Sequence, residues 1–324
     1  MSIVNGQDVE AHYSSGSTSG NEIFNKIKTY LNENNITTVR LTDLAPVDEF
    51  HIGGIPGTIS LMDKLDIKST DTILDVGAGL GGPARFVADK YGCKVIGVDL
   101  TKKFVDAGNE ITNSLFPQLK DKVHLVVGSG LDLEKALPSD STGLFDKAYL
   151  LHVGMNITDK TKLINEISKK LKPNGKLAIY DVMKMSSDEL EFPLPWASDK
   201  SHDACASVDV YKKAFENSGF NVTVENSRLE FGLGVFEKRK MHSGKTPFGL
   251  NVHQENFATK GANMVKNMKA GRMAPYELIG VKNNITSSNN LWRKERESIK
   301  GEKQNLERGS ALSKIWFPAA EREF

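Results

Sequence analysis

A short glycine-rich segment gives the first indication of chemistry. Gly77, Gly79, Gly81 and Gly82 follow directly on the apolar run TILDV and precede a stretch with helical spacing. Glycine lets the backbone turn tightly and approach a ligand, because no Cβ stands in the way. Asp99 closes the next apolar run, where a carboxylate can accept both hydroxyl groups of a ribose. The spacing therefore predicts a site for a nucleoside-containing cofactor.

Two kinds of cofactor fit this glycine pattern, because Gly77, Gly79 and Gly82 also match a dinucleotide fingerprint. Asp75 distinguishes them, since it is an acid two positions before the first glycine. A carboxylate there would repel a pyrophosphate and oppose the helix N-terminus that attracts it. It would instead attract the ammonium and sulfonium groups of S-adenosylmethionine, directly or through water. Charge therefore favours the methyl donor over a nicotinamide or flavin dinucleotide.

The elements that would position these residues follow an alternating pattern. β-branched runs alternate with amphipathic stretches from residue 72 onward, which is typical of parallel strands joined by crossover helices. Strands are predicted at 72–76, 94–99, 122–128, 145–153, 176–182, 220–227 and 276–282, and helices at 21–32, 83–92, 104–115, 160–171 and 208–218. The fold expected is an α/β, Rossmann-like, seven-stranded and mostly parallel sheet with helices on both faces. Between the strand at 220–227 and the last strand, no regular pattern stands out.

Composition limits the class of protein. Of the 324 residues, 39% are hydrophobic and 26% charged, and the formal net charge of +1 offers no basic surface for nucleic acid. Cys93 and Cys205 are far apart, so neither a disulfide framework nor a metal site is expected. No signal peptide or membrane-spanning stretch is recognised. We therefore expect a cytoplasmic protein that acts on a small molecule, with no nucleic-acid or membrane partner and no metal.

The motif block resembles one family. LDVGAGLGGPARFVA followed by GCKVIGVDLT is similar to motif I and its successor in class I S-adenosylmethionine-dependent methyltransferases. HYSSGS, LAPVDEFHIGG, LHVGMNITDK, LKPNGKLAIYDV and FPLPWASD resemble the subgroup of sarcosine/dimethylglycine N-methyltransferase-like enzymes. The resemblance covers about residues 9 to 282. It implies S-adenosyl-L-methionine as cofactor, S-adenosyl-L-homocysteine as product, and an N-terminal helical lid.

The resemblance also implies a set of site residues. Cofactor contacts are expected from Asp75, Gly77, Gly79, Leu80, Gly81, Asp99, Leu100, Ser129, Gly130, Leu131, Leu151 and His51. Many relatives have an Asp at the position of Ser129, so adenine recognition here is expected to rely more on the backbone. Catalytic roles are expected for His152 and Tyr13, and substrate contacts for Asn156, Asp181 and Trp196.

Each of these roles has a plainer alternative. His152 either accepts the proton of an attacking ammonium, since histidine titrates near neutrality, or only bonds to backbone beneath the cofactor. Tyr13 and His51 either belong to a lid that dries the site or only pack near the N-terminus. Trp196 with Asp181 either receives a methylated ammonium by cation–π attraction or packs in the core.

Three segments and one leading activity are predicted. Residues 1–68 form the lid, 69–282 the cofactor-binding domain with a substrate-side insertion, and 283–324 a C-terminal appendage. Its Trp292, Trp316 and Phe317 are candidate anchors that dock either on the domain or on a second subunit, the latter giving a homodimer. The activity expected is methyl transfer to the nitrogen of a small amine or amino acid. Oxygen, carbon or sulfur acceptors are the runner-up, because acceptor pockets come from variable loops. An NAD(P)-dependent oxidoreductase is the distant alternative, and the intact glycines disfavour a degenerate binding protein.

Overall fold

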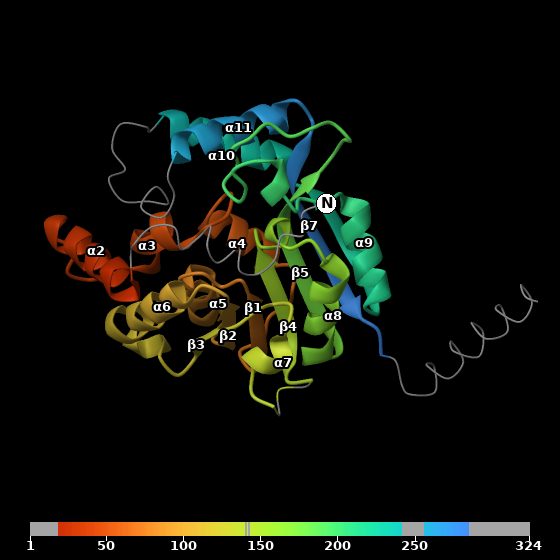
Figure 1. Cartoon of the computed structure of the whole chain (residues 1–324). Coiled ribbons are helices and arrows are strands. Elements are labelled where there is room, and N and C mark those ends of the chain that lie inside the picture. The colour runs from red at the N-terminus through yellow and green to blue at the C-terminus, as the bar shows by residue number, and fades with distance from the viewer. Residues whose placement is uncertain (1–18, 140, 142, 242–255, 285–324) are drawn as a thin grey trace, which may run out of the picture. The chain divides into compact units, whose positions relative to one another are not determined.

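The computed structural model describes residues 19–139, 141, 143–241 and 256–284, without the side chains of 239–241 and 257. Its helices of four or more residues are α2 (Gly20–Glu33), α3 (Leu41–Asp48), α4 (Ile55–Met62), α5 (Gly82–Tyr91), α6 (Lys102–Leu115), α7 (Leu133–Ala136), α8 (Lys160–Lys170), α9 (Val208–Asn217), α10 (Leu229–Met241) and α11 (Phe257–Lys269) (Figure 1). Its strands are β1 (Thr72–Val76), β2 (Lys94–Asp99), β3 (Val123–Val127), β4 (Phe145–Leu151), β5 (Leu171–Lys184), β6 (Phe220–Ser227) and β7 (Met273–Lys282). Short 3₁₀ turns η1, η2 and η3 cover Pro117–Leu119, Gly154–Asn156 and Lys200–His202.

The strands form a seven-stranded sheet in the order β3-β2-β1-β4-β5-β7-β6. The pairs from β3 to β5 are parallel, whereas β7 is antiparallel to both β5 and β6. The predicted seven-stranded, mostly parallel sheet is confirmed. The strand order reverses between β1 and β4, and open α/β sheets bind ligands in the crevice outside the carboxyl ends of the strands at such a point.

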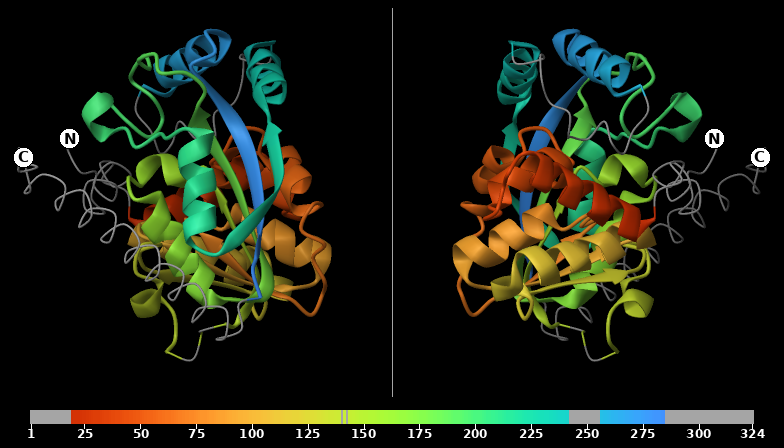
Figure 2. Two further views of the ribbon diagram at one scale, coloured as in Figure 1. Left: turned by 90° about the vertical axis from the view of Figure 1, so that its right-hand side faces the viewer. Right: turned by 90° about the vertical axis from the view of Figure 1, so that its left-hand side faces the viewer.

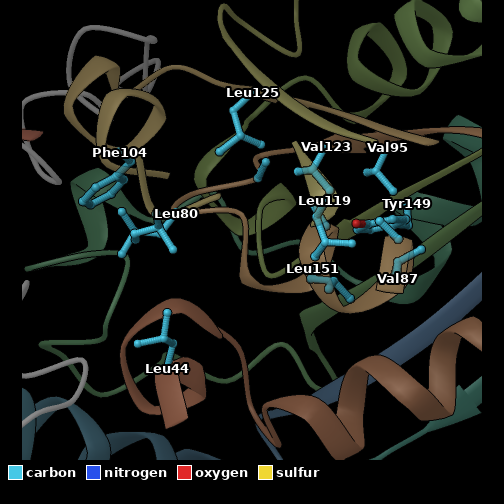
Figure 3. Close-up of a cluster of buried hydrophobic side chains, with 14 of the residues drawn as sticks. Leu44, Leu80, Val87, Val95, Phe104, Leu119, Val123, Leu125, Tyr149 and Leu151 are labelled. Atoms are coloured by element: carbon cyan, nitrogen blue, oxygen red, sulfur yellow. The ribbon is translucent and has the colours of Figure 1, made fainter. Parts of the chain in front are cut away.

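Two apolar cores cover the two faces of the sheet. One lies beneath α2, α5 and α6, and the other beneath α8 and α9, so helices flank both faces (Figure 2). Figure 3 shows part of the first core, in which Leu80 lies beside Phe104. β1 is buried along almost its whole length because both faces are covered, which explains why its sequence is nearly all apolar.

The N-terminal helix begins at a well-defined cap. Ser19 accepts a hydrogen bond from the amide of Glu22, and the Glu22 carboxylate accepts one from the amide of Ser19. This reciprocal arrangement satisfies amides that the first turn of a helix leaves free. The predicted helix at 21–32 is therefore confirmed as α2, which packs on α6.

α10 and α11 fall between β6 and β7, where the sequence predicted no regular element. α10 and α11 pack on each other and on β7, and they lie beyond the carboxyl ends of the parallel strands (Figure 1). The sequence LEFGLGVFEKRKM of α10 carries apolar residues on every side and two glycines, so it has no amphipathic period to detect. Gly232 is nonetheless required, because a Cβ there would lie 2.9 Å from Cγ of Pro275 in β7.

The chain divides into two compact units, Met1–Lys282 and Asn283–Phe324. Nearly all of the second unit lies outside the described residues, including Trp292, Trp316 and Phe317, which the sequence offers as docking anchors.

Deletion of residues 285–324 is expected to leave the affinity for S-adenosylhomocysteine unchanged, because the last strand of the sheet ends at Lys282. Calorimetric titration of full-length and truncated protein measures this, and light scattering on both reports association. Loss of affinity on truncation would show that the tail is part of the site. A change of mass alone would assign the tail to a subunit interface.

Candidate active site

The glycine turn joins β1 to α5 and needs glycine at three positions. Gly77, Gly79 and Gly81 have φ angles of 78°, 54° and 76°, which side chains other than glycine rarely adopt. A Cβ on Gly77 would lie 2.3 Å from Cγ2 of Val153, and one on Gly79 would lie 3.1 Å from the Phe50 ring. The turn is therefore held tightly between the segment after β4 and the segment after α3.

Asp99 ends β2 beside this turn. One carboxylate oxygen accepts from the amide of Gly79 at 2.8 Å, and the other accepts from the amide of Thr101 at 2.8 Å. Withdrawal from water raises the pKa of Asp99, and these two amides act in the opposite direction. The carboxylate is thus oriented from both sides, and each oxygen keeps a lone pair for a ribose hydroxyl.

The N-terminus of α5 is already covered by protein. A Cβ on Gly82 would lie 2.4 Å from the carbonyl oxygen of Asp48 and 2.7 Å from its Cγ. The Asp48 carboxylate accepts from Nη2 of Arg85 at 2.8 Å, and both side chains are buried. A dinucleotide would place its pyrophosphate at such a helix end. Since α3 places a carboxylate at this helix end, the arrangement disfavours a dinucleotide.

NADH and NADPH are therefore expected to leave the melting temperature unchanged at millimolar concentration, whereas S-adenosylhomocysteine raises it. A ligand that binds the native state must stabilise it. Thermal denaturation with each compound measures the difference. A shift with a dinucleotide alone would support the oxidoreductase alternative.

Asp75 lies deeper than its position in the motif indicates. It is 2% exposed and accepts a hydrogen bond from the hydroxyl of Tyr149 at 3.0 Å. Burial raises the pKa of Asp75 to about 8, and the nearby carboxylates of Asp99 and Glu49 add to the effect while Tyr149 lowers it. The position of Asp75 in the motif does not show this burial, which disfavours the ionised carboxylate when no ligand is bound. A cation bound beside it would favour the ionised form.

His152 occupies a strained position at the end of β4. Its φ angle is 56°, and its amide donates to the carbonyl of Tyr180 at 2.7 Å. Nε2 is buried and has no hydrogen-bond partner among the described residues. Withdrawal from water and the neighbouring His51 hold the pKa of His152 well below its usual value. The ring is therefore neutral at neutral pH, and unfavourable backbone strain at this point is typical of a functional position.

Three rings meet at this edge of the sheet. The ring centroid of His152 lies 5.1 Å from that of Tyr180 and 5.9 Å from that of His51, and His51 lies 5.9 Å from Tyr180. The Tyr180 hydroxyl donates to the carbonyl of Ile52 at 3.1 Å. The segment after α3 is thereby fixed to β5 beside the end of β4, which brings His51 and His152 together.

The other expected cofactor residues occupy two different environments. Leu80 and Leu151 lie in the buried core of Figure 3, so their side chains face other apolar groups and only their backbones border the turn and strand end. Leu100, Ser129, Gly130 and Leu131 are partly exposed along the ends of β2 and β3, and the amide of Leu131 donates to the Ser129 hydroxyl at 3.2 Å.

The expected substrate residues have partners within the protein. Asp181 is fully buried and accepts from the hydroxyl of Tyr211 at 2.7 Å, although its Oδ1 has no partner among the described residues. Burial raises the pKa of Asp181 to about 6.

Trp196 is 3% exposed and its Nε1 donates to Asp203 at 2.9 Å, in a core rich in methionine. Asn156 is buried in η2 and donates to the carbonyl of Val153 at 3.2 Å. Tyr13 lies outside the described residues.

Sequence reasoning missed Glu49, Thr58 and Tyr180. Glu49 accepts from His51 at 2.6 Å and from Thr58 at 2.9 Å. The only signal for Glu49 is its place in LAPVDEFHIGG, and Tyr180 looked like an ordinary strand residue.

Among the described residues, no three His, Cys, Asp or Glu side chains gather as a metal ion would require. No helix in the described ranges is long and apolar enough to cross a membrane.

These features are those of a class I methyltransferase, in which a glycine turn after β1 and an acid after β2 hold the cofactor. Residues 74–179 match the family of the methyltransferase domain. The chain therefore contains the domain of the S-adenosylmethionine-dependent methyltransferases. The residues present fit this cofactor, because three positions of the turn have positive φ angles that favour glycine and Asp99 is oriented beside the turn.

The curated relatives include phosphoethanolamine N-methyltransferases. Phosphoethanolamine N-methyltransferase 1 of Zea mays is 28% identical over 207 residues, which cover 63% of this chain and 39% of that enzyme. The chain thus spans well under half the length of this plant relative. Phosphoethanolamine N-methyltransferase of Plasmodium falciparum is 26% identical over 242 residues, which cover 73% of this chain and 88% of that enzyme.

Solved structures share the fold. The Haemonchus contortus phosphoethanolamine N-methyltransferase 2 with S-adenosyl-L-methionine aligns with a TM-score of 0.63 at 17% identity, over 77% of this chain and 59% of that one. A putative sarcosine dimethylglycine methyltransferase from Galdieria sulphuraria aligns at 0.56 and 21%, over 72% and 86%. Geranyl diphosphate C-methyltransferase from Streptomyces coelicolor with S-adenosyl-L-homocysteine aligns at 0.57 and 21%, over 70% and 77%.

Proposed function

We propose that this protein transfers a methyl group from S-adenosylmethionine to the nitrogen of a small amine or amino acid. The observation that carries the proposal is Nε2 of His152 at the carboxyl end of β4, beside the glycine turn, which is buried and has no hydrogen-bond partner among the described residues. An amine attacks a methyl group only through its lone pair, so a protonated amine must first lose a proton. A neutral imidazole within the site accepts such a proton.

The cofactor supplies an electrophilic methyl group on a cationic sulfur. Gly77, Gly79 and Gly81 would let the backbone approach its methionine and ribose, and Asp99 would hold the ribose hydroxyls. Leu100 and the segment from Ser129 to Leu131 would border the adenine. The buried carboxyl of Asp75 would lose its proton as the cation binds, because a nearby positive charge stabilises the ionised form.

The proposal also gives roles to the remaining residues expected from the sequence. His152 accepts the ammonium proton at Nε2, while Asp181 and Trp196 support the substrate side through Tyr211 and Asp203. Tyr13 belongs to an N-terminal lid that excludes water, since methyl transfer from a cation proceeds best in a closed, dry site. Asn156 stays a proposed substrate contact.

Three classes of methyl acceptor are compared: a phosphorylated amine, an amino acid and an isoprenoid diphosphate. The names of the relatives favour phosphoethanolamine and sarcosine. On the substrate side several basic groups are already paired with acids: Lys64 and Arg228 with Glu277, Lys184 with Asp203, and Arg272 with Glu191. Both the phosphate of a phosphorylated amine and the carboxylate of an amino acid need a basic partner, so the test includes both. A C-methyltransferase with the same fold makes an isoprenoid diphosphate the third class.

The test incubates the protein with S-adenosylmethionine and, separately, phosphoethanolamine, glycine, sarcosine, a phenol, a thiol and an isoprenoid diphosphate. Release of S-adenosylhomocysteine is measured in each. The proposal expects turnover with at least one amine and none with the phenol or thiol. Turnover confined to the isoprenoid would replace N-methylation by C-methylation.

We further infer that the protein works in the cytoplasm. Cys93 and Cys205 are free and buried, which suits a reducing compartment. A homodimer formed through the tail is part of the proposal and is read from the light scattering described above.

A further inference from the structure

Glu49 follows α3 directly and has no part in the function proposed above. Its side chain is 2% exposed and that of His51 is 1% exposed. Buried carboxylates destabilise a fold unless hydrogen bonds compensate for the lost hydration. We propose that Glu49, with Thr58, is a positioning residue for methyl transfer. It fixes the ring of His51, which packs edge-on beside the catalytic His152. This inference rests on the proposed function.

One carboxylate oxygen of Glu49 accepts hydrogen bonds from both His51 and Thr58. Oε2 accepts from Nε2 of His51 at 2.6 Å and from the hydroxyl of Thr58 at 2.9 Å, and Nε2 of His51 lies 3.0 Å from that hydroxyl. An ionised carboxylate only accepts hydrogen bonds, so it selects the form of His51 with a proton on Nε2. The arrangement resembles an acid that orients an imidazole in a catalytic pair.

The Nδ1 side of the His51 ring is enclosed as well, since Nδ1 lies 3.4 Å from the carbonyl oxygen of Ile52. A Cβ on Gly57 would lie 3.3 Å from Cε1 and 3.4 Å from Nδ1 of His51. The ring therefore lies against the backbone of α4 on one edge and against Glu49 on the other. A rotation about its χ angles would break both contacts at once.

The fixed ring acts on His152. The two ring centroids are 5.9 Å apart in an edge-on arrangement, and Tyr180 closes the group. His51 also contributes to the lowered pKa of His152. If the His51 ring turned, the wall beside Nε2 of His152 would move, and an ångström of misplacement at a reacting centre costs about 100-fold in rate.

Glu49→Gln is expected to lower kcat at least about tenfold while the KM for S-adenosylmethionine changes less than about threefold. His51→Gln should give a similar loss. The double variant Glu49→Gln/His51→Gln should be no slower than the slower single variant, because both changes remove the same interaction. Thr58→Val should lose part of the rate, and Thr58→Ser, which keeps the hydroxyl, should restore it.

Nitrogen-15 spectra of the histidine rings provide a readout besides activity. The wild-type protein should show His51 protonated at Nε2, and Glu49→Gln should change the signals of both His51 and His152. Asp71→Asn is the matched control, since Asp71 is a buried carboxylate paired with Lys147 at the opposite edge of the sheet. It should lower the melting temperature and leave kcat unchanged.

Two results would overturn the inference alone: active wild-type protein whose Glu49→Gln variant keeps kcat within about twofold, or losses that multiply in the double variant. Wild-type protein that methylates none of the acceptors would overturn the proposed function, and this inference with it.

Discussion

Replacement of His152 by alanine is expected to lower kcat with the preferred amine by about 100-fold or more, which is the usual contribution of a positioned acid or base. The reason is structural: Nε2 is buried at the carboxyl end of β4 and has no hydrogen-bond partner among the described residues, so it is positioned to accept the proton that the attacking amine gives up. Steady-state kinetics with S-adenosylhomocysteine release as readout measure the effect.

A second variant distinguishes loss of the base from misfolding. His152 has a φ angle of 56°, which asparagine tolerates better than most residues, so His152→Asn should keep the local backbone and still lose the base. His124→Ala on the exposed side of β3 is the matched control and should retain full kcat. A His152→Asn variant with wild-type kcat would leave only the backbone role for this residue.

Replacement of Asp99 by alanine is expected to weaken S-adenosylmethionine binding more than tenfold. Hydrogen bonds to a charged group contribute about 1.5 to 3 kcal/mol each, and a tenfold loss corresponds to about 1.4 kcal/mol. The variant also leaves the amides of Gly79 and Thr101 without the acceptor that orients the turn. Calorimetric titration measures the change.

Asp106→Ala is the matched control, since Asp106 is exposed on α6 and is paired only with Lys102 at a helical spacing. It should bind the cofactor as the wild-type protein does. Unchanged affinity in a folded Asp99→Ala variant would contradict the assignment of Asp99 to the ribose.

Much of the sheet could be predicted because its strands are short, apolar and separated by amphipathic helices. β1, β2 and β6 begin and end at the predicted residues. β5 begins five residues earlier than the predicted start at 176, since the chain passes from α8 into the strand without a loop and Leu171 pairs with Phe145. α10 and α11 were missed because α10 is apolar on all sides and carries glycines.

The candidate site, like the fold, could be predicted only where local sequence determines the structure. The glycine turn and Asp99 act through local backbone geometry, so their spacing alone predicts them. The Glu49, Thr58 and Tyr180 contacts depend on α4 lying over the ends of β4 and β5, which no local pattern encodes. The environment of Asp75 could not be predicted for a related reason: the motif places the carboxyl at the end of a strand, but it does not show the burial that raises its pKa.

The central claim is that this chain moves a methyl group from S-adenosylmethionine to an amine nitrogen. The most direct measurement uses a donor labelled with deuterium in the methyl group and identifies the product of each acceptor by mass spectrometry. The account predicts a labelled methyl group on the nitrogen of an amine, in amounts equal to the S-adenosylhomocysteine formed. Label on carbon, oxygen or sulfur, or no label on any acceptor while S-adenosylhomocysteine binds tightly, would contradict it.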